Sequence, residues 1–275
     1  MQTDLRRLQL TQLEVLKVID RICNKHGIQY SLYAGSLLGA VRHQAFIPWD
    51  DDLDVCMLRS EYDRFLEIWE QEGPAGYILQ NKENAPEFTQ SFTKIRKDHT
   101  TFLEAEWERG RYHTGIFVDI FPVDRIPEGK LAQVLFRWDC MRYQLLTREF
   151  PPSKAGFATR TVCHAILAVI PKARRAAERK RLQKKITRYQ DRGNLPLIFI
   201  ETLASMKKTY PADMMDEFVY LPFEDMEAQC VKQWDRNLQL KFGDYMQLPP
   251  EEQRTWTHHP VCVDFEHNYD ERVSE

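Results

Sequence analysis

The stretch that decides the fold reads AGSLLGAVR at residues 34–42 and, after a short spacer, IPWDDDLDV at residues 47–55. Small residues come first, and a run of carboxylates then enters an apolar segment. Side chains two positions apart in a strand point the same way, so we expect Asp52 and Asp54 to share a face. Asp50 joins them if the strand begins early enough. Neighbouring carboxylates repel one another unless they stay in water or share a cation. The run therefore predicts a cation site.

The Gly35-Ser36 pair just upstream predicts the start of a helix. Free N–H groups at a helix start accept an anion, and the serine hydroxyl adds a donor. Carboxylate oxygens suit Mg²⁺, with Mn²⁺ as the alternative, and such ions bind together with substrate phosphates. The combination indicates chemistry on a nucleotide phosphate. A solvated acidic loop is the alternative, and the apolar Leu53 and Val55 between the acids favour a buried strand instead.

A second stretch, GIFVDIFPVD at residues 115–124, predicts a buried strand over residues 116–121. Asp119 is the one carboxylate within it, and a buried carboxylate needs a partner. A shared metal ion would make Asp119 the third acid beside Asp52 and Asp54. A capping or salt-bridged structural role is the alternative.

The composition narrows the class of protein. The chain has 275 residues, a formal net charge of −3 and a pI of about 6.3, which argues against a nucleic-acid partner. Its six cysteines are scattered without CxxC spacing, so we expect buried free thiols in a reducing compartment. No signal peptide is visible, and the apolar stretch 165–170 is too short to cross a bilayer. We expect a soluble, cytoplasmic protein.

Periodicity predicts alternating helices and strands in the first half and helices after Pro127. Ser60 is expected to cap one helix, with Gly73 ending it, and a charged turn is expected at residues 109–111. The expected helices are 5–26, 37–42, 60–72, 131–147, 160–170 and 171–192, and the expected strands are 29–34, 53–58, 77–80, 91–95, 100–104 and 116–121.

The predicted helix 171–192 is strongly basic. Such a run is most often a solvated helix face. The sharper interpretation is a peripheral contact with an anionic membrane surface or an anionic polymer.

These stretches resemble the LicD family of phosphotransferases, a branch of the nucleotidyltransferase-fold superfamily that includes the fukutin-related proteins. The order and spacing of GSLLGAVRH and IPWDDDLDV carry most of the resemblance. Phe242 departs from the tyrosine that is common in the family, without touching the predicted catalytic residues. The matching segments are 23–28, 33–43, 46–55, 94–97, 115–124, 221–224 and 242–250, the last two being weaker.

The resemblance implies an α+β fold, with a small mixed nucleotidyltransferase-like sheet flanked by helices. Residues 1–127 would form the catalytic core. Residues 128–275 would form a mainly helical region packed on that core, including the basic helix 171–192.

The resemblance also implies a reaction. Family members typically transfer phosphocholine from CDP-choline to a hydroxyl of a cell-surface glycan, such as teichoic acid or lipopolysaccharide. Gly35 and Ser36 match the donor-phosphate turn, Asp52 and Asp54 the metal-binding pair, and Asp119 the third acid. Whether Asp119 is a metal ligand, a general base or both stays open.

Three basic residues near these stretches are candidates for neutralising phosphate oxygens. They are Lys94 and Arg96 on one predicted strand and Arg42 at the end of the short helix, and for each an ordinary ion pair is equally expected. A choline group would need an aromatic cage. Sequence order alone does not indicate which aromatic side chains converge, Trp107 and Trp234 among them.

Two alternative functions remain at this stage. A nucleotidylyltransferase would use the same carboxylates but release pyrophosphate. A non-catalytic scaffold would bind a polyanion through the basic helix 171–192. The sequence indicates neither the transferred headgroup, nor the acceptor glycan, nor the oligomeric state.

Overall fold

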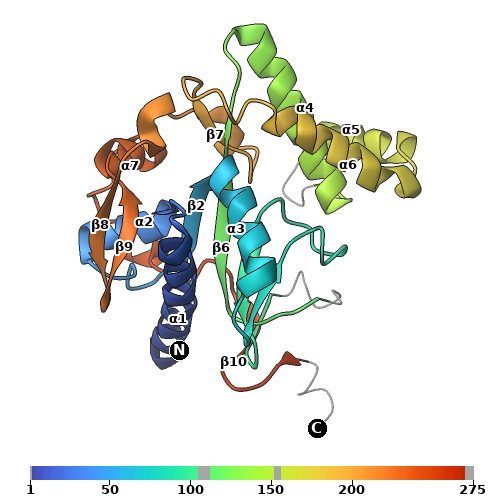
Figure 1. Cartoon of the computed structure of the whole chain (residues 1–275). Helices are drawn as coiled ribbons and strands as arrows, with labels where there is room; N and C mark the ends of the chain where they lie inside the picture. Colours follow the sequence, from blue (N-terminus) through green and yellow to red (C-terminus); the bar gives the residue numbers. More distant parts are fainter. Residues whose placement is uncertain (1, 105–111, 152–155, 270–275) are drawn as a thin grey trace. The chain divides into compact units, whose positions relative to one another are not determined.

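The structure is a computed structural model that describes residues 2–104, 112–151 and 156–269. The predicted turn at 109–111 and Trp107 lie outside these residues. The chain is a mixture of helices and short strands, as predicted (Figure 1). It divides into two compact units, the first made of Met1–Gln80, Thr93–Pro122 and Met214–Glu275, and the second of Asn81–Phe92 and Val123–Asp213.

The first unit is built on a small sheet with the strand order β1-β2-β6-β4-β3. Two antiparallel pairs, β5 with β10 and β8 with β9, complete its strands. Its α-helices are α1 (Gln2–His26), α2 (Ala34–His43), α3 (Arg59–Glu72) and α7 (Trp234–Phe242). Its strands are β1 (Ser31–Leu32), β2 (Asp54–Leu58), β3 (Tyr77–Gln80), β4 (Thr93–Lys97), β5 (Thr101–Glu104), β6 (Phe117–Arg125, of which 117–122 belong to this unit), β8 (Phe218–Phe223), β9 (Met226–Val231) and β10 (Pro260–Asp264).

Helix α1 follows its predicted amphipathic pattern. Leu8, Leu16 and Ile19 are fully buried on one face. Gly27 adopts a φ of +63°, and the Ile28 N–H donates to the Cys23 carbonyl at 2.9 Å. A left-handed glycine that closes the last turn is a common helix C-terminus, so the predicted end at Gly27 is confirmed.

Helix α3 buries the predicted aromatic face but begins differently. The first helical residue is Arg59, one position before Ser60, and no side chain caps the helix. The prediction of a Ser60 cap is therefore wrong. The buried Arg59 guanidinium instead lies over the Tyr62 ring and faces Asp63 at 3.6 Å. The Gly73 N–H closes the end by donating to the Trp69 carbonyl, as expected.

Strand β6 is the centre of the sheet, and all nine of its residues are buried. It lies between β2 and β4. Its register against β4 puts Asp119 opposite Lys94. On the other side, the Asp119 N–H donates to the carbonyl of Leu53, the residue before β2. The sheet thus places Asp119 beside the segment that carries the acidic run.

The second unit contains α4 (Lys130–Arg148), α5 (Phe157–Val169), α6 (Lys172–Thr187), the short strand β7 (Leu197–Phe199) and the 3-10 turn Ser205–Lys207. The three helices were predicted, although α6 ends at residue 187. Strand β7, which pairs with the Val123–Arg125 end of β6, was not predicted. The core of the second unit is mainly helical and includes Phe136, Cys140, Leu146, Leu182 and Ile186.

The C-terminal residues belong with the N-terminal ones. A boundary at residue 127 was predicted, whereas Met214–Glu275 group with Met1–Gln80 and contribute the strands β8, β9 and β10. Buried polar contacts explain the difference, because the Tyr30 N–H donates to Gln229 Oε1 at 2.7 Å and the Val231 N–H to Ser31 Oγ at 3.0 Å. The six cysteines, all of them among the described residues, form no disulfide. Among the described helices, none is both long and apolar enough to cross a membrane.

Candidate active site

The start of α2 and the start of β2 are joined directly. The Asp54 N–H donates to the buried Ser36 hydroxyl at 2.8 Å, and the Tyr33 N–H donates to the Asp54 carbonyl at 2.9 Å. The N–H groups of Ser36 and Leu37 turn back to the Tyr33 carbonyl. Ser36 therefore fixes the position of Asp54, and its own hydroxyl proton remains available to a ligand.

Gly35 allows the acidic run to approach the helix closely. A Cβ atom at this position would lie 2.5 Å from Asp50 Oδ2. That distance is well inside van der Waals contact, so any larger residue here would displace the Asp50 carboxylate. Gly35 and Asp50 are therefore adjacent.

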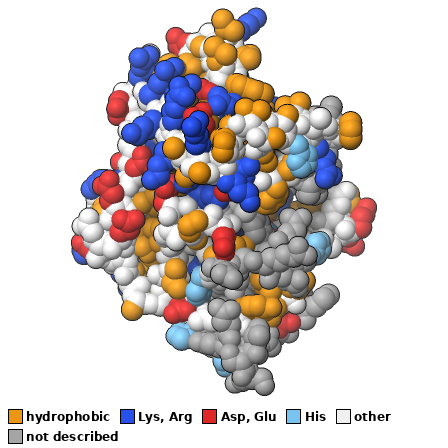
Figure 2. Space-filling model, turned by 90° about the vertical axis from the view of Figure 1, so that its right-hand side faces the viewer, with side chains coloured by type: hydrophobic (Ala, Val, Ile, Leu, Met, Phe, Trp, Pro, Cys, Tyr) orange, Lys and Arg blue, Asp and Glu red, His pale blue; other side chains and the backbone are white. Residues whose placement is uncertain are grey.

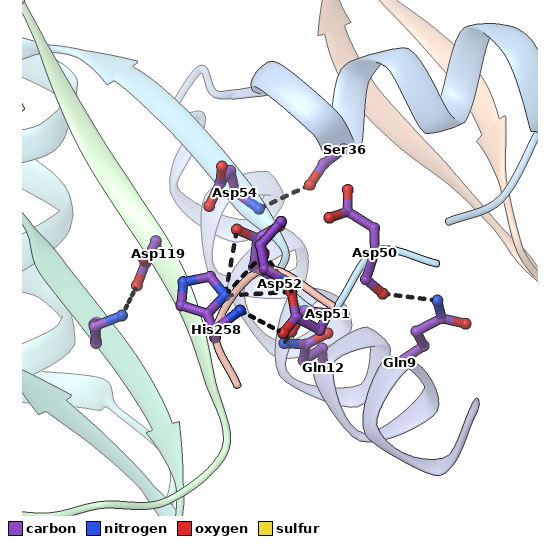
Figure 3. A network of polar contacts seen from close by, with 11 residues as sticks. Gln9, Gln12, Ser36, Asp50, Asp51, Asp52, Asp54, Asp119 and His258 are labelled. Atoms are coloured by element: carbon purple, nitrogen blue, oxygen red, sulfur yellow. Dashed lines mark hydrogen bonds and ion pairs between the residues drawn. The ribbon is translucent and has the colours of Figure 1, made fainter. Parts of the chain in front are cut away.

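Helix α1 holds the backbone of the acidic run, which sequence reasoning did not predict. The buried Gln9 amide donates to the Asp50 carbonyl, and the buried Gln12 amide donates to the Asp51 carbonyl, each at 2.9 Å (Figure 3). Two glutamines one helical turn apart would be a usable signal if the run were already known to pack on this helix.

The acidic run and Asp119 form one electrostatic cluster (Figure 3). Burial, and next the charges of Asp52 and Asp119, raise the pKa of Asp54 well above its usual range. Burial likewise raises the pKa of Asp52, assisted by Asp51 and Asp119 and opposed by His258. The pKa of Asp50 rises to about 8 through burial and its carboxylate neighbours. The predicted trio Asp52, Asp54 and Asp119 is therefore close enough to interact.

Asp119 already has a cation beside it. Its Oδ1 accepts a hydrogen bond from Lys94 Nζ at 2.7 Å, and both side chains are more than nine-tenths buried. Lys94 Nζ also lies 3.2 Å from the centroid of the Phe117 ring. For Lys94 we predicted either neutralisation of substrate phosphate or an ordinary ion pair, and the structure shows an ion pair with the third acid.

Asp51 anchors the C-terminal segment of the chain. Its fully buried carboxylate accepts the Thr257 and His258 N–H groups at 3.1 and 3.0 Å and the Thr257 hydroxyl at 2.5 Å. Burial opposes ionisation, but the hydrogen bonds from His258 and Thr257 outweigh it and lower the pKa of Asp51 to about 2. We call this set of contacts the Asp51 clasp.

The Asp51 clasp brings His258 into the carboxylate cluster, and sequence reasoning missed this residue. His258 Nδ1 lies 3.3 Å from Asp51 Oδ1 and 3.9 Å from Asp52 Oδ2. Burial favours the neutral ring, yet Asp51 and Asp52 dominate and raise the pKa of His258 to about 9. The imidazolium therefore supplies positive charge that the carboxylates need. The one local feature of the sequence at this position is the pair His258-His259, and two adjacent histidines do not by themselves predict a contact with the acidic run.

Lys241 on α7 is a second residue that was missed. Its Nζ donates to the Tyr33 hydroxyl at 2.6 Å and lies 3.8 Å from the centroid of that ring. Its charge partly offsets the raised pKa of Asp54. Lys241 therefore adds a cation near the start of α2.

The two remaining predicted cations hydrogen-bond to neutral oxygen atoms, although Arg96 is near enough to Asp119 to feel its charge. Arg42 donates to the Tyr245 carbonyl at 2.9 Å and lines an open cavity of about 450 Å³, together with Trp49 and Phe242. The buried Arg96 donates to Gln80 Oε1 and the Gly115 carbonyl, each at 2.6 Å. Phosphate binding by Arg42 and Arg96 stays a prediction.

The cluster fits a divalent cation in charge and in ligand type. The pKa values of Asp50, Asp52 and Asp54 are raised because the three carboxylates are buried and repel one another. A bound cation would relieve that repulsion. Across residues 2–104, 112–151 and 156–269, no three acidic, histidine or cysteine side chains stand in ready-made metal-ligand geometry.

A small sheet with paired acids beside a Gly-Ser helix start defines the nucleotidyltransferase-like class of transferase. The model of the LicD/FKTN/FKRP nucleotidyltransferase domain matches residues 27–162. The lipopolysaccharide cholinephosphotransferase LicD of Haemophilus influenzae is 30% identical over 256 residues, covering 90% of this chain and 93% of its own length. An uncharacterized protein of Rickettsia prowazekii is 27% identical over 43% of this chain and 41% of its own length. The chain belongs to the LicD family of phosphotransferases.

Proposed function

We propose that this chain transfers phosphocholine from CDP-choline to a hydroxyl of a cell-surface glycan and releases CMP. The observation that carries the proposal is the gathering of Asp52, Asp54 and Asp119 beside the Gly35-Ser36 helix start, in a chain of the LicD family. The relative from Haemophilus influenzae is named for choline phosphate and lipopolysaccharide. CDP-choline as the donor, and teichoic acid as the other acceptor class, belong to the proposal.

The proposed cofactor is Mg²⁺, with Mn²⁺ as a substitute, and Asp52, Asp54 and Asp119 are the residues that would hold it. When bound, the ion would neutralise charge on the donor diphosphate and on the departing CMP. The raised pKa values of Asp52 and Asp54 support this assignment, because a bound cation would stabilise their charged forms.

The side chains of the chain supply the remaining steps of the proposed reaction. The acceptor hydroxyl oxygen forms a bond to the phosphocholine phosphorus while the bond from that phosphorus to CMP breaks. Asp119 takes the hydroxyl proton, and Lys94 orients the Asp119 carboxylate through the 2.7 Å contact. Gly35 and the Ser36 hydroxyl face the donor phosphates.

The proposed place of action is the cytoplasmic side of the membrane, where nucleotide-activated donors are made.

The test is incubation of the purified chain with CDP-choline, Mg²⁺ and lipopolysaccharide, followed by separate assays for CMP and pyrophosphate. CDP-ethanolamine and CDP-glycerol serve as competing donors, and EDTA as the metal-free arm. Asp52→Asn is the active-site variant. Asp216→Asn, at an exposed carboxylate, is the matched control.

We expect CMP release that requires Mg²⁺ and is lost in Asp52→Asn but kept in Asp216→Asn. Pyrophosphate in place of CMP would support the nucleotidylyltransferase alternative. Full activity in EDTA would contradict the metal assignment, and no release of either product from any donor would contradict the transferase proposal.

A further inference from the structure

Helix α4 carries an apolar stripe that is exposed. Its members repeat at helical spacing, so they lie along one face of the helix. The opposite face of α4 packs in the core of the second unit through Phe136, Cys140 and Tyr143. The stripe, with its exposed fractions, is Leu131 (74%), Val134 (62%), Leu135 (57%), Trp138 (44%) and Met141 (36%).

Helix α5 extends the exposed apolar surface. Phe157 is 88% exposed and Val169 is 80% exposed, one at each end of the helix. An apolar stripe that runs along one face of a helix, as on α4, is uncommon on a water-exposed protein surface and marks an interaction site. The α4 stripe and these α5 side chains form what we call the apolar face of the second unit.

Helix α6, which packs beside α4, brings positive charge to the same unit. Arg142 of α4 contacts Glu178 of α6 at 2.7 Å, and Lys185 of α6 contacts Asp139 of α4 at 3.4 Å. Between residues 172 and 187 the sequence has eight Lys and Arg residues but one acidic residue. Space-filling atoms show basic and apolar side chains gathered next to one another in the upper half of Figure 2.

The ion pairs of α6 separate its cations into two groups. Arg175, Arg179 and Lys185 contact the acidic side chains of Glu149, Glu83 and Asp139, so their charges are partly neutralised within the unit. Lys180 and Arg181 belong to the same group, because they face Glu83 and Glu178. Lys172, Arg174 and Lys184 are exposed, and within the described part of the chain no acidic side chain pairs with them. The charges of these three side chains are therefore available to a binding partner outside the chain.

We propose that the apolar face and the exposed cations of α6 form a docking surface for an anionic lipid bilayer. An apolar stripe that includes a tryptophan, beside Lys and Arg on a neighbouring helix, is the pattern of an interfacial membrane-binding helix. The charge segregation supports lipid over another copy of the chain, because a second basic helix would be repelled from the first. The inference does not depend on the substrates proposed above.

The test is co-sedimentation of the full chain with extruded vesicles, one set of phosphatidylcholine alone and one with equal parts of phosphatidylglycerol. Leu131→Gln/Leu135→Gln removes part of the stripe without adding charge. Lys172→Gln/Lys184→Gln removes two exposed cations. Arg21→Gln/Lys25→Gln on α1 is the matched control, because it removes the same charge from exposed positions in the first unit.

We expect binding to the anionic vesicles and much weaker binding to neutral ones. Each membrane-proximal cation contributes about a fivefold change in partition, so the α6 variant should bind about 25-fold more weakly. The stripe variant should also lose binding, while the α1 control keeps it. All four proteins should show the same thermal unfolding midpoint, because the changed side chains are exposed.

Two results would overturn the inference. One is wild-type chain that stays in the supernatant with anionic vesicles. The other is binding that neither the stripe variant nor the α6 variant weakens. Light scattering adds a separate check, because a dimer that Leu131→Gln/Leu135→Gln dissociates, without any vesicle binding, would assign the stripe to self-association instead.

Discussion

At the scale of single residues, we expect the carboxylate cluster to lower the stability of the metal-free protein while it supports CMP release. Ionisation of Asp54 costs free energy in this buried place, since burial and its neighbours Asp52 and Asp119 raise its pKa. Asp54→Asn removes that cost, so the metal-free protein should unfold at a higher temperature. CMP release should fall about 10³-fold, because a ligand to the proposed ion is lost.

The measurements are thermal unfolding in EDTA and CMP release in Mg²⁺. Asp216→Asn should change neither quantity. An Asp54→Asn protein that is both less stable without metal and fully active would contradict the proposal that Asp54 is a metal ligand.

Gly35 provides a second test at this scale. In Gly35→Ala the added Cβ would stand 2.5 Å from Asp50 Oδ2, and the carboxylate has to move. We expect CMP release to drop about tenfold while the circular dichroism spectrum stays unchanged, since small displacements at a site are costly to a reaction. Gly156→Ala is the control, because its Cβ would meet no atom within 4 Å. Equal activity in both variants would contradict a role for this close approach.

A site residue is predictable when a short stretch of sequence around it reveals its environment, and it is not predictable when its contacts are distant along the chain. Asp52 and Asp54 share one strand, and Asp119 is a carboxylate in a buried run, so local patterns reveal all three. His258 and Lys241 contact residues more than 200 positions away, and no local pattern records such contacts. Lys94 was correctly placed on a strand. Only the register of β4 against β6 shows that it faces Asp119.

At the scale of elements, the Asp51 clasp should control how the C-terminal segment is held. Asp51→Ala leaves the N–H groups of Thr257 and His258 without their acceptor and His258 without its main counter-charge. We expect a loss of about 3 kcal/mol in the free energy of unfolding, measured with urea. Trypsin should also cleave faster after Arg254. Asp216→Ala is the control, and a loss below about 1 kcal/mol would contradict the clasp.

The turn between β4 and β5 should show a pH dependence through Asp98. Asn268 Nδ2 and His113 Nε2 contact the Asp98 carboxylate at 2.9 and 3.1 Å. The hydrogen bond from Asn268, followed by the one from His113, lowers the pKa of Asp98 to about 2. A lowered folded-state pKa stabilises the fold above the unfolded-state value near 4, and this contribution is lost as the pH falls to about 2.

Urea unfolding at several pH values checks this prediction. The difference in stability between wild type and Asp98→Asn should shrink between pH 4 and pH 2. A difference that grows between pH 4 and pH 2 would show that Asp98 is not held as the charged form.

Element types were more predictable than element ends. Helix α1 and strand β6 have strong periodic or continuous apolar patterns, so their existence was evident. The cap of α3 was mispredicted because serine signals a helix start locally, whereas the buried Arg59 makes its contacts inside the first turn. Strand β7 has three residues and depends on pairing with β6, so its sequence alone carries too little signal.

At the scale of the whole molecule, the family resemblance and the α+β class are confirmed, and the division of the chain is different from the one expected. The return of residues 214–275 to the N-terminal unit was not predictable, because it depends on buried hydrogen bonds such as that from Tyr30 to Gln229. The residues next to Tyr30 in the sequence carry no signal of a hydrogen-bond partner that lies about 200 positions away.

The Asp51 clasp also has a consequence for the order of folding. The His258 N–H and the Asp51 carboxylate are 207 positions apart, so their contact closes a very long loop and carries a large entropic cost. Local helices such as α1 form in microseconds. During refolding from denaturant, the ability to release CMP should therefore return measurably later than the helical signal, and a molecule can look folded while its chemistry is still unassembled.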